Sequence, residues 1–147
     1  MSDKRLYTIG FTKRNARQFF TRLQEAGVGR IIDVRLRNTS QLAGFAKCDD
    51  LRYFLDVVCG IDYVHRPELA PTKELLTGFK KGNISWETYA EKYRQLVRER
   101  DMAAKMAAHL RDGDCLLCSE RTPEHCHRRL LAEHLRGKLG GLEVCHL

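Results

Sequence analysis

Short apolar runs alternate with longer amphipathic stretches along the chain, and this alternation constrains the fold more than any other feature. The stretches between the runs have helical periodicity and are long enough to act as crossovers between parallel strands. We expect strands at residues 5–9, 31–34, 61–65, 115–118 and 143–146, and helices at 15–26, 51–58, 72–111 (broken at 81–83) and 124–136. This order predicts a single three-layer α/β/α domain over residues 1–147, with a mostly parallel sheet of about five strands.

Size and composition agree with a folded domain. Of the 147 residues, 43% are hydrophobic and 31% are charged, with 3 Pro and 11 Gly, which excludes disordered and collagen-like chains. No apolar run reaches the roughly 18 residues that a membrane span needs. Residues 1–5 carry no apolar core of a secretory signal. We therefore expect a cytoplasmic protein that does not associate with membranes.

The chain has six cysteines, at positions 48, 59, 115, 118, 126 and 145. An even count is compatible with disulfides, but a cytoplasmic chain long enough to bury its own core does not need them. We expect all six thiols to be reduced. Three of them, at 115, 118 and 126, lie close together in the sequence and require a separate explanation.

The charge balance favours an anionic partner. Lys and Arg total 26 against 19 Asp and Glu, which gives a net charge of +7, and 17 of the 26 cations are Arg. The planar guanidinium pairs bidentately with phosphate and carboxylate groups. Solvated basic helix faces explain part of this excess, so the charge alone does not separate a phosphorylated small molecule from a nucleic acid.

Polar residues follow two of the predicted strands, where a parallel sheet binds its ligands. Asp33 and Arg35 close the second strand, and Cys118 and Glu120 close the fourth. The chain then turns at Pro123 and enters a helix, whose N-terminus attracts anions and lowers the pKa of thiols. We expect one pocket with Asp33, Cys118, Glu120, Cys126 and His127 as catalytic candidates, and with Arg35 and Arg128 binding an anion. Cys126, in the predicted first turn, is the preferred activated thiol.

Three motifs occur in an order that resembles the domain-of-unknown-function family 488 (DUF 488) over the whole chain. They are Thr8-Ile9-Gly10, Asp33-Val34-Arg35, and Cys118-x-Glu120 followed by Cys126-His127-Arg128. The resemblance implies a site at these residues, and it implies no reaction because the family has no agreed activity. The chain departs from the family pattern in three places, at Phe11-Thr12, at Asn38 and at Leu69-Ala70-Pro71. Phe11-Thr12 replaces the usual His-Ser, which leaves His65 as the nearest alternative acid or base.

The spacing of the residues argues against two other kinds of site, a structural zinc site and a thiol-based catalytic loop. Cys115, Cys118, Cys126 and His127 are four soft ligands that could form a structural zinc site, but Cys115 and Cys118 should point to opposite faces of their strand. A phosphatase or sulfurtransferase loop closes with Arg about six residues after its Cys. Glu124 and Ala132 occupy those positions here. We therefore expect no metal and no thiol-based loop of that type.

The expected function is to bind or act on a phosphorylated, nucleotide-like or nucleic-acid anion, without a cofactor. The glycine-rich turn of dinucleotide-binding folds is missing after the first strand, where only Gly10 occurs. Three alternatives stay open: a non-catalytic nucleic-acid-binding module, a structural Cys/His metal site, and a buried Arg–carboxylate network that only holds the strand ends.

Overall fold

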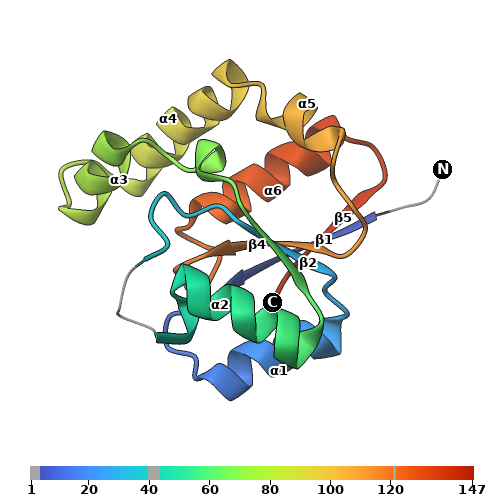
Figure 1. Ribbon diagram of the computed structural model, residues 1–147. Coiled ribbons are helices and arrows are strands. Elements are labelled where there is room, and N and C mark those ends of the chain that lie inside the picture. Colours follow the sequence, from blue (N-terminus) through green and yellow to red (C-terminus); the bar gives the residue numbers. More distant parts are fainter. Residues whose placement is uncertain (1–3, 40–43, 121) are drawn as a thin grey trace.

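The strands form one sheet, in which every pairing is parallel. The computed structural model describes residues 4–39, 44–120 and 122–147. Within them the strands are β1 (Lys4–Gly10), β2 (Arg30–Asp33), β3 (Asp62–His65), β4 (Asp114–Cys118) and β5 (Leu142–His146). Their order across the sheet is β3-β2-β4-β1-β5 (Figure 1). The structure confirms the expected α/β class with its parallel sheet.

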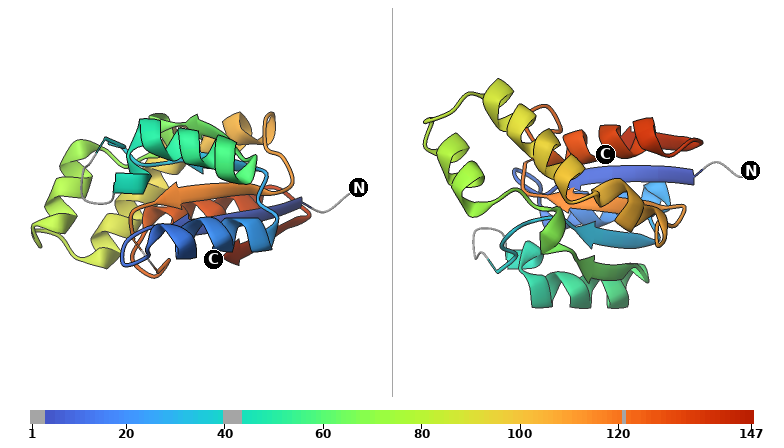
Figure 2. Two further views of the ribbon diagram at one scale, coloured as in Figure 1. Left: turned by 60° about the horizontal axis from the view of Figure 1, so that its bottom comes forward. Right: turned by 90° about the horizontal axis from the view of Figure 1, so that it is seen from above.

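Helices cover both faces of the sheet and complete the three layers (Figure 2). One face is covered by α1 (Ala16–Ala26) and α2 (Cys48–Phe54), which continues as a π-helical turn (Leu55–Cys59). The other face is covered by α3 (Lys73–Lys80), α4 (Trp86–Glu99), α5 (Met102–Ala107) and α6 (His127–Lys138). Two short 3-10 turns, Gly44–Ala46 and Pro67–Leu69, lie in the connections. None of the described helices is long and apolar enough to cross a bilayer.

Strand alternation divides the core into two hydrophobic clusters. Leu116 and Cys118 of β4 pack in the cluster beneath α3 to α6. Cys115 and Leu117 pack in the other, with the aromatic residues of α1. The period of two along a strand therefore separates Cys115 from Cys118, as the sequence predicts.

The long predicted helix at 72–111 is divided into α3, α4 and α5. The break at 81–83 is confirmed, and the Ser85 hydroxyl caps α4 by accepting from the Thr88 N–H (3.1 Å). A second break, absent from the sequence prediction, falls at Asp101, whose φ of 49° lies in the left-handed region. Asp101 is the N-cap of α5, and its left-handed backbone redirects the chain from α4 into α5.

The start of α6 differs from the prediction. The helix begins at His127 instead of residue 124, and Cys126 is its N-cap with extended angles of φ −134° and ψ 137°. The Cys126 N–H donates to the Pro123 carbonyl (3.3 Å), which holds the preceding residues in a turn. Cys126 thus lies one position before the first helical turn.

Candidate functional site

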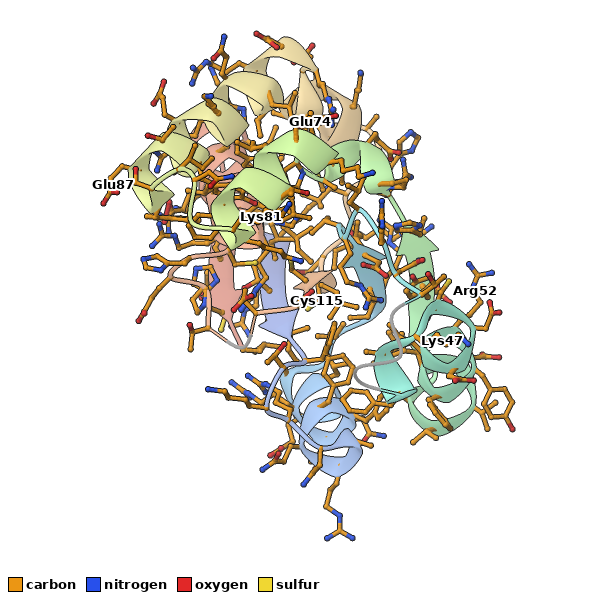
Figure 3. The ribbon with its side chains drawn as sticks, turned by 90° about the vertical axis from the view of Figure 1, so that its left-hand side faces the viewer. Lys47, Arg52, Glu74, Lys81, Glu87 and Cys115 are labelled. Carbon is orange, nitrogen blue, oxygen red and sulfur yellow. The ribbon has the colours of Figure 1, made fainter. Side chains whose placement is uncertain are left out.

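A cavity of about 390 Å³ lies beyond the carboxyl ends of β2 and β4, on the sheet face covered by α3, α4 and α6. Figure 3 looks onto the molecule from this side, with α3 and the Lys81 that follows it above the sheet. Three regions line the cavity: Arg35, Leu36 and Arg37 after β2; Leu76, Phe79, Lys80 and Tyr89 of α3 and α4; and Cys118, Ser119, Glu120, His125, Cys126 and His127 of the β4–α6 connection.

Arg35 is held against the end of β2 by Asp33. Its Nε donates to Oδ1 of Asp33 (2.9 Å) and its Nη2 donates to Oδ2 (2.8 Å). Nη2 also donates to the Ala46 carbonyl (2.8 Å), and the guanidinium lies over the Phe11 ring, 5.1 Å from its centroid. The Tyr63 hydroxyl donates to Oδ2 of Asp33 (2.6 Å). Asp33 therefore fixes the position of Arg35 and does not itself line the cavity.

Burial and pairing act in opposite directions on Arg35. Burial of the guanidinium lowers its pKa, but the hydrogen bonds and the negative charge of Asp33 outweigh burial and raise it. The pKa of Tyr63 is also raised, by burial first and then by the charge of Asp33. The result is a permanently charged Arg35 at the cavity wall, only 4% exposed.

Cys118, Cys126 and His127 form a buried cluster, and all three line the cavity. One ligand atom of each lies within 4.8 Å of the others. Sγ of Cys118 is 3.6 Å from Nδ1 and 3.9 Å from Nε2 of His127. Nε2 lies 2.9 Å from the Val34 carbonyl. Because a carbonyl only accepts, Nε2 carries the proton of the neutral ring and Nδ1 keeps a lone pair.

The two thiols of this cluster have different acidities. The hydrogen bond to Cys126 and burial together raise the pKa of Cys118. Burial also raises the pKa of Cys126, but the hydrogen bond from Cys118 and the positive charge of Arg128 overcome it and lower the pKa well below its usual value. Cys126 is therefore the more acidic thiol of the pair.

Arg128 does not line the cavity. Its side chain is fully buried, and its Nη1 donates to the Glu120 carbonyl (2.6 Å). The structure therefore brings Arg35, Cys118, Glu120, Cys126 and His127 to one cavity, with Asp33 behind Arg35 and Arg128 behind the β4–α6 connection. The side chain of Glu120 is exposed at the cavity rim.

His65 does not take the place of the family pattern's missing histidine in the cavity. His65 does not line it, and Nε2 of His65 donates to the Arg35 carbonyl (2.8 Å). His65 thus supports the backbone that carries Arg35. His125, which the sequence reasoning did not select, does line the cavity and stacks near Trp86, with ring centroids 5.0 Å apart.

Sequence reasoning missed the residues that α3 and α4 contribute. Phe79 and Tyr89 form an aromatic wall, with ring centroids 4.7 Å apart, and Lys80 and Arg37 lie exposed at the rim. Tyr89 belongs to an i, i+3, i+7 aromatic stripe, which is typical of a core face, and most of that stripe is indeed core. The two adjacent lysines Lys80 and Lys81, at the end of a helix, are the sequence feature that could have indicated Lys80.

A second cavity, of about 450 Å³, lies against α5 and near the start of β2. Its lining includes Arg66, Arg100 and Lys105, and it shares no residue with the cavity at the strand ends. None of the site residues expected from the sequence lies there. The two cavities are therefore separate, and only the first contains the candidate site.

Comparison with known proteins identifies the family. The model of a family described as Domain of unknown function DUF488 matches residues 15–135, which is most of the chain. The chain therefore belongs to this family. No curated protein matches it, and no solved structure does either.

Proposed function

We propose that this member of the DUF488 family binds a phosphorylated, nucleotide-like anion in the cavity at the strand ends. The observation that carries the proposal is the charge of the lining. Arg35, Arg37 and Lys80 contribute three cations, and Glu120 is the one carboxylate among the described lining residues. Such a wall attracts an anion and gives Arg35 a fixed guanidinium with which to bind it.

The start of α6 adds to this attraction. Cys126 gives the helix no side-chain cap, and no acidic residue stands in its first turn. The backbone N–H groups and the positive end of the helix dipole favour a negatively charged group at this position. Because Cys126 and His127 line the cavity, the helix N-terminus and the cations act on the same ligand.

The aromatic wall supports a nucleotide-like ligand over a simple anion. Phe79 is half-buried in this wall and offers a ring on which a base can stack, with Tyr89 packed behind it. A volume of about 390 Å³ is within the range of roughly 300–1,000 Å³ that is usual for small-ligand sites. These features favour a single nucleotide or sugar phosphate over a long nucleic acid. We expect this binding to take place in the cytoplasm, where the thiols of the site stay reduced.

The site also has the groups for chemistry on the bound anion. Glu120, which is exposed at the cavity rim, can act as an acid or base on that anion. Asp33 and Arg128 are positioning residues: Asp33 orients Arg35, and Arg128 holds the Glu120 carbonyl.

The proposal is tested by calorimetric titration with AMP, ADP, ribose 5-phosphate, inorganic phosphate and a short oligonucleotide. The informative variant is Arg37→Gln/Lys80→Gln, since both side chains are exposed and can be changed without affecting the core. The control Arg22→Gln/Lys138→Gln removes the same charge from exposed positions outside the cavity. We expect about a tenfold loss of affinity in the first variant and none in the control.

Two results would contradict the proposal. One is that none of the small anions binds the parent protein. The other is an equal loss of affinity in both double variants, which would mean that net charge and not the cavity attracts the ligand. Binding of the oligonucleotide alone, with a steep salt dependence and no effect of the variants, would instead support the nucleic-acid-binding alternative.

A further inference from the structure

We propose that Cys118, Cys126 and His127 bind one zinc ion, with two thiolates and one imidazole as ligands. The sequence disfavoured a metal because Cys115 points away from Cys118, and the structure keeps Cys115 in the opposite core cluster. The other three side chains nevertheless converge from β4 and the start of α6, with one ligand atom of each within 4.8 Å of the others.

The distances are close to those of a tetrahedral zinc site. Zinc lies about 2.3 Å from a cysteine sulfur and about 2.0 Å from a histidine nitrogen, so a sulfur and a nitrogen ligand are about 3.5 Å apart. Sγ of Cys118 and Nδ1 of His127 are 3.6 Å apart. The same sulfur is 3.9 Å from Nε2, so it faces the ring. Zinc binding would require Sγ to move toward the Nδ1 edge of the ring.

An independent observation concerns the His127 ring. Histidine ligands of metals usually donate their second ring N–H to a carbonyl or carboxylate, which fixes the tautomer and the ring orientation. Nε2 of His127 donates to the Val34 carbonyl at 2.9 Å. The ring is also held by an edge contact with Tyr93, with centroids 5.3 Å apart. His127 is thus oriented by its surroundings, with Nδ1 left to accept.

The donor set and the burial indicate which metal and which type of site. Two sulfurs and one imidazole nitrogen suit zinc and not the hard cations magnesium and calcium, which take oxygen ligands. Three protein ligands with a fourth position left for water or substrate are typical of catalytic zinc sites. All three residues line the cavity, so that fourth position would face the bound ligand. A dication there would strengthen the attraction for an anion.

The test uses the full chain, reduced and freed of metal with a chelator, and cobalt(II) followed by zinc as the probes. No organic ligand is added, so the outcome is separate from that of the proposed function. We expect one cobalt ion per chain, with a thiolate-to-cobalt charge-transfer band and the intense visible bands of tetrahedral cobalt, both displaced by one equivalent of zinc. Absence of the charge-transfer band in the folded parent protein would overturn the proposal.

Cys126→Ser is the informative variant, because serine is favoured at a helix N-cap and the chain should still fold. Its matched control is Cys59→Ser, a half-buried cysteine outside the cluster. We expect Cys126→Ser to weaken zinc binding at least tenfold and the control to leave it unchanged. Equal affinity in Cys126→Ser and the parent protein, or an equal loss in both variants, would rule out this site.

A second measurement does not depend on any variant. The parent protein is alkylated with N-ethylmaleimide with and without zinc, and the modified cysteines are identified by mass spectrometry. Zinc should slow the modification of Cys118 and Cys126 and leave Cys48 and Cys59 unaffected. Protection of other cysteines in place of these two would contradict the assignment.

Discussion

Arg35 and Asp33 lie two residues apart at the end of β2 and form a two-point ion pair that is almost fully buried. Nε and Nη2 of Arg35 donate to the two oxygens of the Asp33 carboxylate at 2.9 and 2.8 Å. The pair fixes the plane of the guanidinium at the wall of the cavity. It accounts for the Asp-Val-Arg motif: the carboxylate positions the cation, and the valine between them packs into the core.

Removing the charge of Asp33 should therefore cost far more stability than removing a carboxylate at the surface. We expect Asp33→Asn to lower the free energy of unfolding by about 3–5 kcal/mol, because Arg35 would stay buried without its counter-charge. Asp62→Asn is the control, since Asp62 forms an exposed ion pair with Arg111 (3.6 Å) and should cost less than about 1 kcal/mol. Urea unfolding measures both. Similar losses in the two variants would show that the buried pair has no special role.

The end of α1 gives a prediction that concerns the backbone alone. Gly27 has a φ of 79° and ends the helix, with its N–H donating to the Gln24 carbonyl (3.1 Å). Gly27→Ala should lower stability by about 1–2 kcal/mol because of the left-handed backbone. Gly29→Ala is the matched control: its backbone is not left-handed, and a methyl group there meets no atom within 4 Å. We expect Gly29→Ala to be neutral or slightly stabilising, so equal thermal shifts in the two variants would refute the argument.

The aromatic wall predicts how ligand preference depends on Phe79. Phe79 lines the cavity and packs against Trp86, with ring centroids 5.7 Å apart. Phe79→Leu keeps an apolar side chain but removes the ring face. We expect it to weaken AMP binding by about 1–3 kcal/mol, the size of a base–aromatic stacking contact, and to leave ribose 5-phosphate binding unchanged. Calorimetric titration of both ligands checks this. A parallel loss for both would mean that Phe79 shapes the cavity without contacting a base.

Much of this fold follows from the sequence because the hydrophobic pattern and the lengths of the connections point to the same structure. The alternation of buried strands and amphipathic stretches requires crossovers, and crossovers require parallel strands. That order also brings Asp33 close to Cys118, since β2 lies beside β4 with Asp33 opposite Leu117. The convergence of the two strand ends was predictable, although the full strand order was not.

The rest of the site depends on packing that local patterns do not specify. Arg128 was expected to bind the anion, yet it shares a helix face with Leu131 and Leu135 and is buried with them. The i, i+3, i+7 spacing of these three residues places Arg128 on the buried face of the helix. A charged residue is rare on such a face, and the sequence therefore favours a role for Arg128 in binding the ligand. The positions of Phe79 and Lys80 follow from how α3 packs over the strand ends, and this is a long-range property.

The start of α6 was misplaced for a local reason. Glu124 and Pro123 are both favourable in the first turn of a helix, so the sequence predicts an early start. The structure instead uses residues 123–126 as a turn, and this puts Cys126 at the N-cap beside Cys118. The shift of three residues creates the cluster of two thiols and one imidazole.

The most direct test of the account is to locate the ligand on the protein by NMR. Backbone amide signals of the full chain are assigned and followed while AMP is added. We predict that the largest shifts occur at Ser119, Glu120 and His127, around the cavity at the strand ends. Shifts concentrated at Lys105 and Met106, in the separate cavity against α5, would contradict the assignment of the site.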